Sequence, residues 1–168
     1  MKATFQIEAL SAEHDRAGFS CGTPALDRYF SEQVTQDVRR RATACYVAVD
    51  ATGTIAGYYT LAAGGVPLTD LPPALAKRLP RYPSVPVARI GRLAVGQKYR
   101  GQKLGSALLW DAVQRTLRSE LAVFALVVDA KDVAAEGFYR HHGFISLGNR
   151  PLQLVLALTG LSRKSGGI

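Results

Sequence analysis

The chain has 168 residues, of which 48% are hydrophobic, and its formal net charge is +8. That length suits one well-filled core, so we expect a single domain over residues 1–161 and a flexible tail at 162–168. Two cysteines cannot build a disulfide framework, and no apolar run is long enough for a signal peptide or a membrane span, which favours a cytoplasmic protein.

The first helix is predicted where Thr23 precedes Pro24, because threonine can cap exposed amides and proline fits the first helical position. Apolar residues then recur every four positions up to a basic run at residues 39–41. The spacing predicts one continuous helix with one buried face, formed by Leu26, Phe30, Val34 and Val38.

Two strands are predicted next, at residues 43–50 and 54–64, and the short turn between them makes a hairpin. Residues 66–86 are rich in proline around a short helical stretch at 73–79, which indicates an excursion outside the sheet. Residues 86–95 return to a strand, in which Gly91 marks a place for a bulge.

The second half predicts a helix over residues 103–118, a buried strand within 121–130, and a short helix ending near His142. Two more strands, at 144–148 and 152–158, complete the chain. Together these elements predict a mixed α/β (α+β) fold with a central sheet and helices on both of its faces.

The stretch "YRGQKLGSALL" at residues 99–109 places glycines in a loop between a strand and a helix. Such a loop exposes backbone amides and the positive end of the helix dipole, which suit a phosphate. Arg100 and Lys103 add positive charge there. A glycine-containing loop before a helix is also common without any ligand, so a second motif is needed.

The second motif is "DAKDVAAEGFYRHHGF" at residues 129–144. Together the two stretches resemble the GNAT superfamily of acyl-CoA-dependent N-acetyltransferases, whose loop pattern (Arg or Gln)-x-x-Gly-x-(Gly or Ala) is similar to residues 100–105. Lys103 stands where that family usually has glycine, so positive φ is expected to be harder to reach there. The later family pattern is matched by Asp132 (in place of Asn), Ala135, Tyr139, Gly143 and Phe144.

The resemblance implies a single-domain GNAT fold that uses acetyl-CoA as cosubstrate and needs no metal. The three histidines also lack a metal-ligand spacing. The residues that the resemblance assigns to the cosubstrate are Leu93, Ala94, Val95, Arg100, Gly101, Gln102, Lys103, Leu104, Gly105, Ser106 and Asp132.

A narrower resemblance rests on "FSCGTPALDRYFSEQVTQDVRRR", "GYYTLAAG", "LPPALAKRLPRYPSVPVARIGRLAV" and "VDAKD". These segments are similar to the GNAT toxins of bacterial type II toxin–antitoxin modules, which acetylate the α-amine of aminoacyl-tRNA and block translation. The resemblance implies a ribbon-helix-helix antitoxin as partner and a homodimer. No association with a membrane is expected, because the sequence has no apolar run long enough to cross a bilayer.

Acetyl transfer needs a donor that protonates the departing thiolate, and the resemblance points to Tyr139 as this catalytic residue. A Phe-Tyr pair near a helix end more often simply packs in a core, and that alternative stays open. The carbonyl oxygen is expected to be polarised by a backbone amide in the stretch Leu93, Ala94 and Val95.

The strand at residues 86–95 contains no Asp or Glu that could serve as a general base. A lysine amine has a reference pKa of about 10.4, whereas an α-amine titrates near about 7.7 to 8.0 and is partly neutral without help. The missing base therefore favours an α-amine substrate. Asp129 or Asp132 could still act as the base.

Basic residues from several segments could contact the phosphates of a tRNA, although they could equally serve solubility or a helix dipole. Our candidates for substrate contact are Arg40, Arg78, Arg89 and Arg92. Two other functions stay open: an acetyltransferase for a small amine or a protein, and a non-catalytic RNA- or CoA-binding regulator, which the altered loop at Lys103 would suit.

Overall fold

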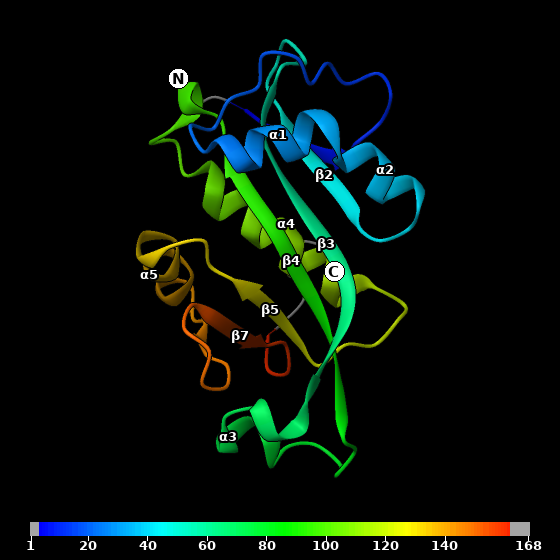
Figure 1. Cartoon of the computed structure of the whole chain (residues 1–168), viewed down its shortest axis with the longest axis vertical. Coiled ribbons are helices and arrows are strands. Elements are labelled where there is room, and N and C mark those ends of the chain that lie inside the picture. The colour runs from blue at the N-terminus through cyan, green and yellow to red at the C-terminus, as the bar shows by residue number, and fades with distance from the viewer. Residues whose placement is uncertain (1–3, 162–168) are drawn as a thin grey trace. The chain divides into compact units, whose positions relative to one another are not determined.

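The computed structural model describes residues 4–161, so the predicted tail at 162–168 lies outside the described residues. The described residues form two compact units: unit 1 comprises residues 4–62 and 91–112, and unit 2 comprises residues 63–90 and 113–161. Two long strands, β3 (Ile55–Pro67) and β4 (Ser84–Val95), run through both units (Figure 1). Hydrogen bonds order the described strands as β1-β2-β3-β4-β5-β7-β6 in one mixed sheet, which confirms the predicted fold class.

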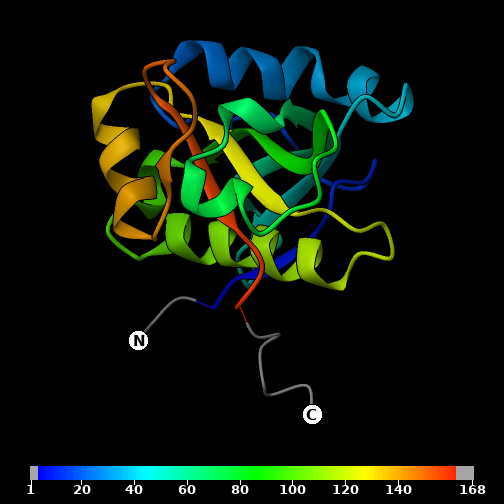
Figure 2. The same ribbon diagram turned by 90° about the horizontal axis from the view of Figure 1, so that it is seen from below.

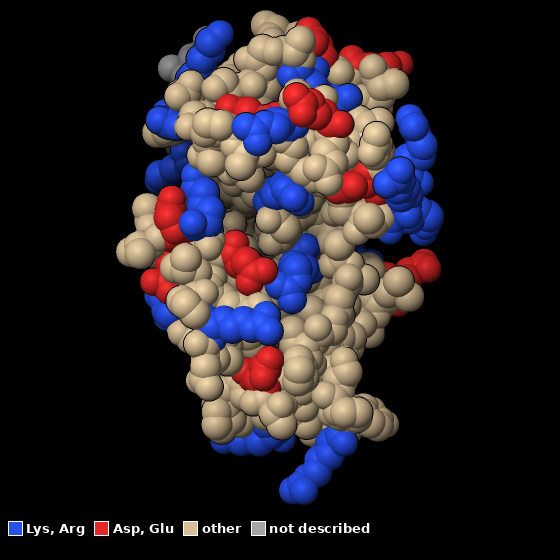
Figure 3. Space-filling view, viewed as in Figure 1, with Lys and Arg blue, Asp and Glu red and all other residues tan. Residues whose placement is uncertain are grey.

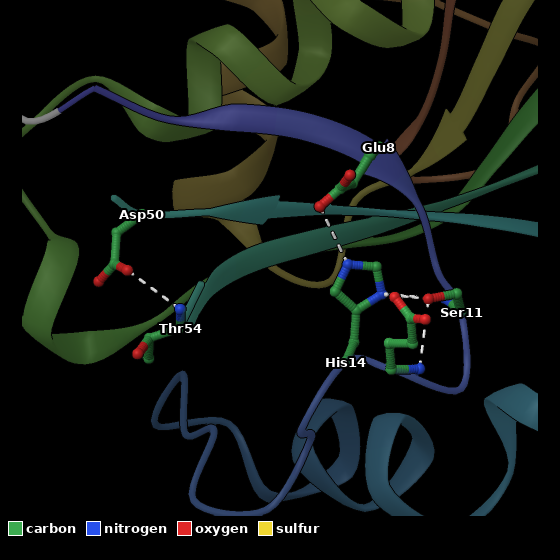
Figure 4. A network of polar contacts seen from close by, with 6 residues as sticks. Glu8, Ser11, His14, Asp50 and Thr54 are labelled. Atoms are coloured by element: carbon green, nitrogen blue, oxygen red, sulfur yellow. Dashed lines mark hydrogen bonds and ion pairs between the residues drawn. The ribbon is translucent and has the colours of Figure 1, made fainter. Parts of the chain in front are cut away.

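Unit 1 begins with three antiparallel strands, β1 (Gln6–Ala9), β2 (Ala44–Val49) and β3. The predicted hairpin of β2 and β3 is confirmed, and its turn is closed by Asp50, whose Oδ1 accepts hydrogen bonds from the amides of Thr52 (2.9 Å) and Thr54 (3.0 Å; Figure 4). Strand β1 was not predicted. It is short and mostly exposed, so it shows no apolar alternation.

The prediction of one helix from Pro24 to the basic run is wrong, because the chain turns at Gln33. Two helices result, α1 (Pro24–Glu32) and α2 (Val34–Arg39), and Figure 2 shows them on the face of the strands opposite to α4. Phe30 and Val34 are fully buried, as the four-residue spacing predicts. A four-residue spacing indicates only that the residues share one buried face. Such a face can continue across a break between two helices.

Unit 1 has one continuous apolar core between these helices and the strands. On the opposite face of β3, Gly57 allows close packing, because a Cβ there would lie 2.8 Å from the Ala94 carbonyl oxygen and 3.0 Å from a methyl group of Leu108. The buried cluster consists of Cys21, Tyr29, Phe30, Val34, Cys45, Val47, Val49, Ile55, Tyr58 and Ala94. Both cysteines of the chain are free thiols in this cluster.

The segment between β1 and α1 is fixed by a small polar network (Figure 4). His14 Nε2 lies 3.1 Å from Glu8 Oε1, and the Ser11 amide donates to His14 Nδ1 at 2.9 Å. Since Nδ1 accepts, Nε2 carries the proton that faces the carboxylate. The histidine therefore has a structural partner on each side of its ring.

Unit 2 is built around β5 (Ala125–Asp129), which pairs in parallel with β4 from Val87↔Ala125 to Ile90↔Val128. On its other edge β5 pairs antiparallel with β7 (Gln153–Ala157), and β7 pairs with β6 (Ile145–Ser146). Helix α5 (Val133–His141) lies between β5 and β6 in sequence. The predicted elements of this half of the chain are all present, although β5, β6 and β7 are each shorter than predicted.

The proline-rich segment leaves the sheet as predicted and forms a 3-10 turn, η1 (Leu68–Asp70), and the short helix α3 (Pro73–Ala76), seen beside one end of β3 and β4 in Figure 1. Apolar residues of this segment, among them Leu71 and Leu75, belong to the core of unit 2. That core consists of Val66, Leu71, Leu75, Val85, Val87, Phe124, Ala125, Val127, Leu147 and Val155.

Helix α4 (Leu104–Arg118) confirms the helix predicted over residues 103–118. Its first turns belong to unit 1, where Leu104 and Leu108 are buried. None of the helices in the described part of the chain is both long and apolar enough to span a membrane.

Candidate functional site

The loop before α4 starts from a firmly held segment of unit 1. Strand β4 continues into a 3-10 turn, η2 (Gln97–Tyr99), where the Gly96 amide donates to the Ala56 carbonyl at 2.7 Å. The hydroxyl of Tyr99 donates to Asp50 Oδ2 at 2.7 Å. Hydrogen bonds from Thr52 and Tyr99 lower the pKa of Asp50 to about 2. Asp50 thus stays ionised near neutral pH and ties the β2–β3 turn to the start of the loop.

Two loop residues adopt the left-handed conformation, Gly101 with φ +81 and Lys103 with φ +61. The sequence predicted that a lysine would resist this conformation, yet Lys103 adopts it. A side chain in this region costs on the order of 1 to 2 kcal/mol, so the surrounding contacts must compensate. The left-handed conformation at residue 103 is therefore reached although a lysine stands there.

The backbone amides of Lys103, Leu104 and Gly105 have no hydrogen-bond acceptor among residues 4–161. Leu104 is 2% exposed and anchors this turn in the core, so the amides that flank it are fixed in place. Unpaired amides at a helix start carry partial positive charge, and the Lys103 ammonium adds a full charge. Open space beside Gly101, where a Cβ would touch nothing within 4 Å, leaves room for an anion such as a diphosphate.

Arg100 is not a free phosphate ligand in this structure. Its Nη2 donates to the Cys21 carbonyl at 2.6 Å and so holds the segment before α1 against the loop. Gly22 has φ +89, and a Cβ there would lie 2.7 Å from the same Nη2. This role of Cys21 and Gly22 was not predicted, because the one local signal for it is a glycine just before Thr23, where the helix starts.

The middle of β4 departs from a regular ladder without breaking the strand. Next to Gly91, where a bulge was predicted, the Arg92 amide donates to the side-chain hydroxyl of Thr60 at 3.0 Å. Thr60 is 2% exposed, and a Cβ at Gly91 would lie 3.0 Å from its hydroxyl oxygen. The Arg92 amide is thus occupied, and the expectation that an amide of residues 93–95 polarises a carbonyl stays a prediction.

The four arginines proposed for substrate contact have different surroundings. In unit 1, Arg40 is exposed at the end of α2, beside which Figure 3 shows a gathering of basic side chains. Arg92 Cζ lies 3.4 Å from the centroid of the Tyr29 ring. In unit 2, Arg78 Nη1 donates to Thr159 Oγ1 at 3.2 Å, and Arg89 Nη1 lies 3.0 Å from Asp129 Oδ2.

Tyr139 belongs to α5 in unit 2 and is 5% exposed. Its ring packs edge to face on Phe138 (5.1 Å between centroids) and on Phe144 (5.4 Å). Burial raises the pKa of Tyr139 above its usual value, so its hydroxyl is protonated throughout the neutral range. That hydroxyl has no hydrogen-bond partner in the described part of the chain and is available as a donor. The ring of Tyr139 can therefore pack in the core while its hydroxyl remains able to donate a proton.

Both carboxylates considered as general bases already have partners. Asp132 is the N-cap of α5, and its Oδ1 accepts from the Ala135 amide at 2.8 Å. Asp129 pairs with Arg89. In each of them one carboxylate oxygen is therefore already engaged by a donor. Within residues 4–161, no group of three or more His, Cys, Asp and Glu side chains is arranged to hold a metal ion.

Comparison with known proteins decides the family. A family model described as "Acetyltransferase (GNAT) family" matches residues 7–144, which include β4, the loop, α4 and α5. The chain belongs to this family. The GNAT resemblance in the two sequence motifs and the mixed fold of the strands and helices are therefore both confirmed.

Individual GNAT relatives cover nearly the whole chain. A protein of Mycobacterium tuberculosis named "tRNA-acetylating toxin" is 33% identical over 151 residues, which is 89% of each chain. "Probable toxin TacT" of Sinorhizobium fredii is 26% identical and covers 91% of this chain and 90% of its own. Among solved structures, "AtaT complexed with acetyl-methionyl-tRNAfMet" has a TM-score of 0.85 at 28% identity and covers 92% of this chain and 95% of its own.

Proposed function

We propose that this GNAT acetyltransferase is a toxin that transfers the acetyl group of acetyl-CoA to the α-amine of aminoacyl-tRNA in the cytoplasm and thereby blocks translation. The observation that carries the proposal is the likeness, over 89% of both chains, to a tRNA-acetylating toxin. The likeness to AtaT in complex with acetyl-methionyl-tRNAfMet agrees with it. The net charge of +8 suits a nucleic-acid substrate.

Acetyl-CoA would supply an activated acyl group as a thioester. The amides of Lys103, Leu104 and Gly105 suit its diphosphate, and a solved AtaTR structure bound with AcCoA, with a TM-score of 0.78 at 26% identity, supports the same cosubstrate. We assign the cosubstrate to the loop residues 100–106 and the strand residues 93–95. We no longer expect direct contacts from the side chains of Arg100 and Asp132, which hold Cys21 and Ala135 instead.

The attacking nitrogen must be neutral, and the chain offers no unengaged carboxylate at the positions considered for a base. Strand β4 contains no Asp or Glu, and Asp129 and Asp132 are held by Arg89 and the Ala135 amide. An α-amine with a pKa near about 7.7 to 8.0 is partly neutral at cytoplasmic pH, so it needs less help than a lysine side chain. The site therefore favours an α-amine.

The departing thiolate requires a proton, and we assign its delivery to the Tyr139 hydroxyl. The phenol is protonated because burial raises its pKa, and the aromatic contacts with Phe138 and Phe144 fix the direction of its ring. General-acid assistance of this kind contributes about 10²- to 10⁴-fold to a rate. An amide of residues 93–95 would stabilise the carbonyl oxygen.

The toxin reading brings two further proposals, a ribbon-helix-helix antitoxin as partner and a homodimer. Both come from the family resemblance, and the toxin names of the two relatives support only the existence of an antitoxin partner. Light scattering of the purified chain tests the second: a mass of twice 18.1 kDa is expected, and a monomer at micromolar concentration would contradict it.

The function is tested by incubating the purified chain with labelled acetyl-CoA and total charged tRNA, deacylated tRNA, a free amino acid or an N-terminal peptide. We expect label on charged tRNA alone, sensitive to mild base that cleaves the aminoacyl ester. In cell-free translation, acetyl-CoA and the chain together are expected to stop synthesis. Transfer to the amino acid or peptide with indifference to charged tRNA would replace the proposal by a small-amine or protein acetyltransferase. Binding without any transfer would indicate a regulator.

A further inference from the structure

Two arginines of β4, Arg89 and Arg92, look equivalent in the sequence, but their guanidinium groups have opposite surroundings. That of Arg89 is paired with the Asp129 carboxylate, so its charge is compensated. That of Arg92 has no hydrogen-bond acceptor among the described residues, and its Cζ lies 3.4 Å from the centroid of the Tyr29 ring. Arg92 therefore keeps all five of its guanidinium N–H donors available.

The ring beneath Arg92 is itself rigid. Tyr29 is 5% exposed and sits in the buried cluster of unit 1. Its hydroxyl donates to Asp37 Oδ2 at 2.8 Å, which links α1 to α2 across the break at Gln33. The break brings residues 29 and 37 together although they lie eight positions apart. The carboxylate thus fixes the ring, and the ring face supports the cation.

The backbone of Arg92 is fixed as well, because its amide donates to the buried Thr60 hydroxyl at 3.0 Å. An arginine held at both its backbone and its guanidinium loses little rotamer freedom when it binds, which favours affinity. A planar guanidinium that is stacked on one face presents its N–H groups at the edge, in the geometry that suits two oxygens of a phosphate.

We propose that Arg92 binds a phosphate near the 3′ end of the charged tRNA, and that Tyr29 and Asp37 are positioning residues that hold its guanidinium ready. This inference rests on the proposed function, since the acceptor supplies the phosphate. The positioning residues touch neither substrate. They act by keeping one cation unpaired and oriented.

The test measures kcat and KM separately for charged tRNA and for acetyl-CoA. Arg92→Ala is expected to raise the KM for charged tRNA about 10- to 100-fold, to leave the KM for acetyl-CoA unchanged, and to reduce the slope of log(kcat/KM) against log[salt] by about one. Arg118→Ala is the control: it removes an exposed arginine at the end of α4 that has no assigned role, and it should raise that KM less than about threefold.

The positioning role is tested in the same assay. Tyr29→Leu removes the ring face and is expected to raise the KM for charged tRNA about 3- to 30-fold, whereas Tyr29→Phe retains the ring and should recover most of that loss. In the Arg92→Ala background, Tyr29→Leu should have no further effect on this KM. Asp37→Asn is a milder second variant, because it keeps an oxygen that can accept the hydrogen bond of the phenol. It replaces Tyr29→Leu if that variant folds poorly.

Three outcomes overturn the inference. Equal effects of Tyr29→Leu with and without Arg92 would make Tyr29 merely a core residue. If Arg92→Ala leaves the KM for charged tRNA unchanged, Arg92 does not bind a phosphate of the tRNA. The proposed function still holds in that case, provided that the wild-type chain acetylates charged tRNA. Absence of wild-type transfer to charged tRNA would overturn both together.

Discussion

Two strand–loop–helix segments of this chain share one local design and differ in how the helix start is used. At the start of α5, Asp132 caps the helix with its own carboxylate. At the start of α4, the amides of Lys103, Leu104 and Gly105 have no acceptor in the described part of the chain, and a lysine stands in the left-handed conformation. The Asp132 carboxylate already accepts a hydrogen bond from the first turn of α5. At the start of α4 the amides stay unpaired beside the positive charge of Lys103, so an anion can bind there.

The difference separates two kinds of residue. We assign the binding of the cosubstrate to the start of α4, and proton transfer to Tyr139, near the end of α5. Changes in the first segment should therefore alter affinity for coenzyme A, and changes in the second should alter turnover or stability.

Tyr139→Phe is expected to lower kcat about 10²- to 10⁴-fold, because the thiolate loses its proton donor. The affinity for coenzyme A, measured by calorimetry, should not change. Tyr82→Phe serves as the control, since Tyr82 is 67% exposed and should retain full activity. A Tyr139→Phe variant as active as wild type would leave only the packing role against Phe138 and Phe144.

The pH profile tests the same segment without a mutation. Below the pKa of the substrate α-amine, near about 7.7 to 8.0, kcat/KM should rise about tenfold per pH unit. The pKa of Tyr139 is raised, so its acid form persists to higher pH than that of an ordinary tyrosine, and no alkaline decline is expected up to pH about 9. Initial rates on charged tRNA measure this, and a decline between pH 8 and 9 would contradict Tyr139 as the acid.

Gly101→Ala should weaken coenzyme A binding about 5- to 30-fold, because φ +81 costs an alanine on the order of 1 to 2 kcal/mol and the loop will relax away from it. Gly137→Ala is the matched control in α5, where added Cβ atoms meet nothing within 4 Å. It should stabilise the protein by about 0.5 to 1 kcal/mol and leave the affinity unchanged. Equal affinities for the two variants would show that the α4 loop does not hold the ligand.

Asp132→Ala should lower the free energy of unfolding by about 1 kcal/mol through loss of the α5 cap, with no change in the dissociation constant of coenzyme A. Asp132→Asn retains a capping oxygen and should be nearly neutral. Denaturant unfolding and calorimetry give the two quantities. A loss of affinity in Asp132→Ala at unchanged stability would restore Asp132 as a cosubstrate ligand.

Lys103→Gly should show the smallest effect, because two consequences oppose each other. Relief of the left-handed strain should raise the free energy of unfolding by up to about 1 kcal/mol, while loss of one cation should weaken coenzyme A binding less than about fivefold. Lys103→Ala loses the charge and keeps the strain, so it should bind more weakly than Lys103→Gly. The reverse order of these two affinities would mean that φ +61 is not required for binding.

Local patterns were enough to predict most of the elements and the position of the glycine-containing loop before α4. The apolar rows of α4 and the hairpin of β2 and β3 were predicted correctly, because periodicity and turn residues act over short distances. The break at Gln33 was not predictable, since both sides of the break bury the same face. Strand β1 was also missed, because an edge strand of four residues with mostly exposed side chains has no pattern to read.

The sequence by itself determined the family motifs, the glycine positions, the basic character and the absence of a carboxylate from β4. Only the tertiary structure decided which groups are engaged: Arg100 with Cys21, Arg89 with Asp129, and Asp132 with its own helix. It also placed the Arg92 guanidinium on Tyr29, although the two residues are 63 positions apart in sequence. Spacing encodes contacts within one turn or strand, whereas the partner of a long charged side chain depends on which distant segments the core brings beside it.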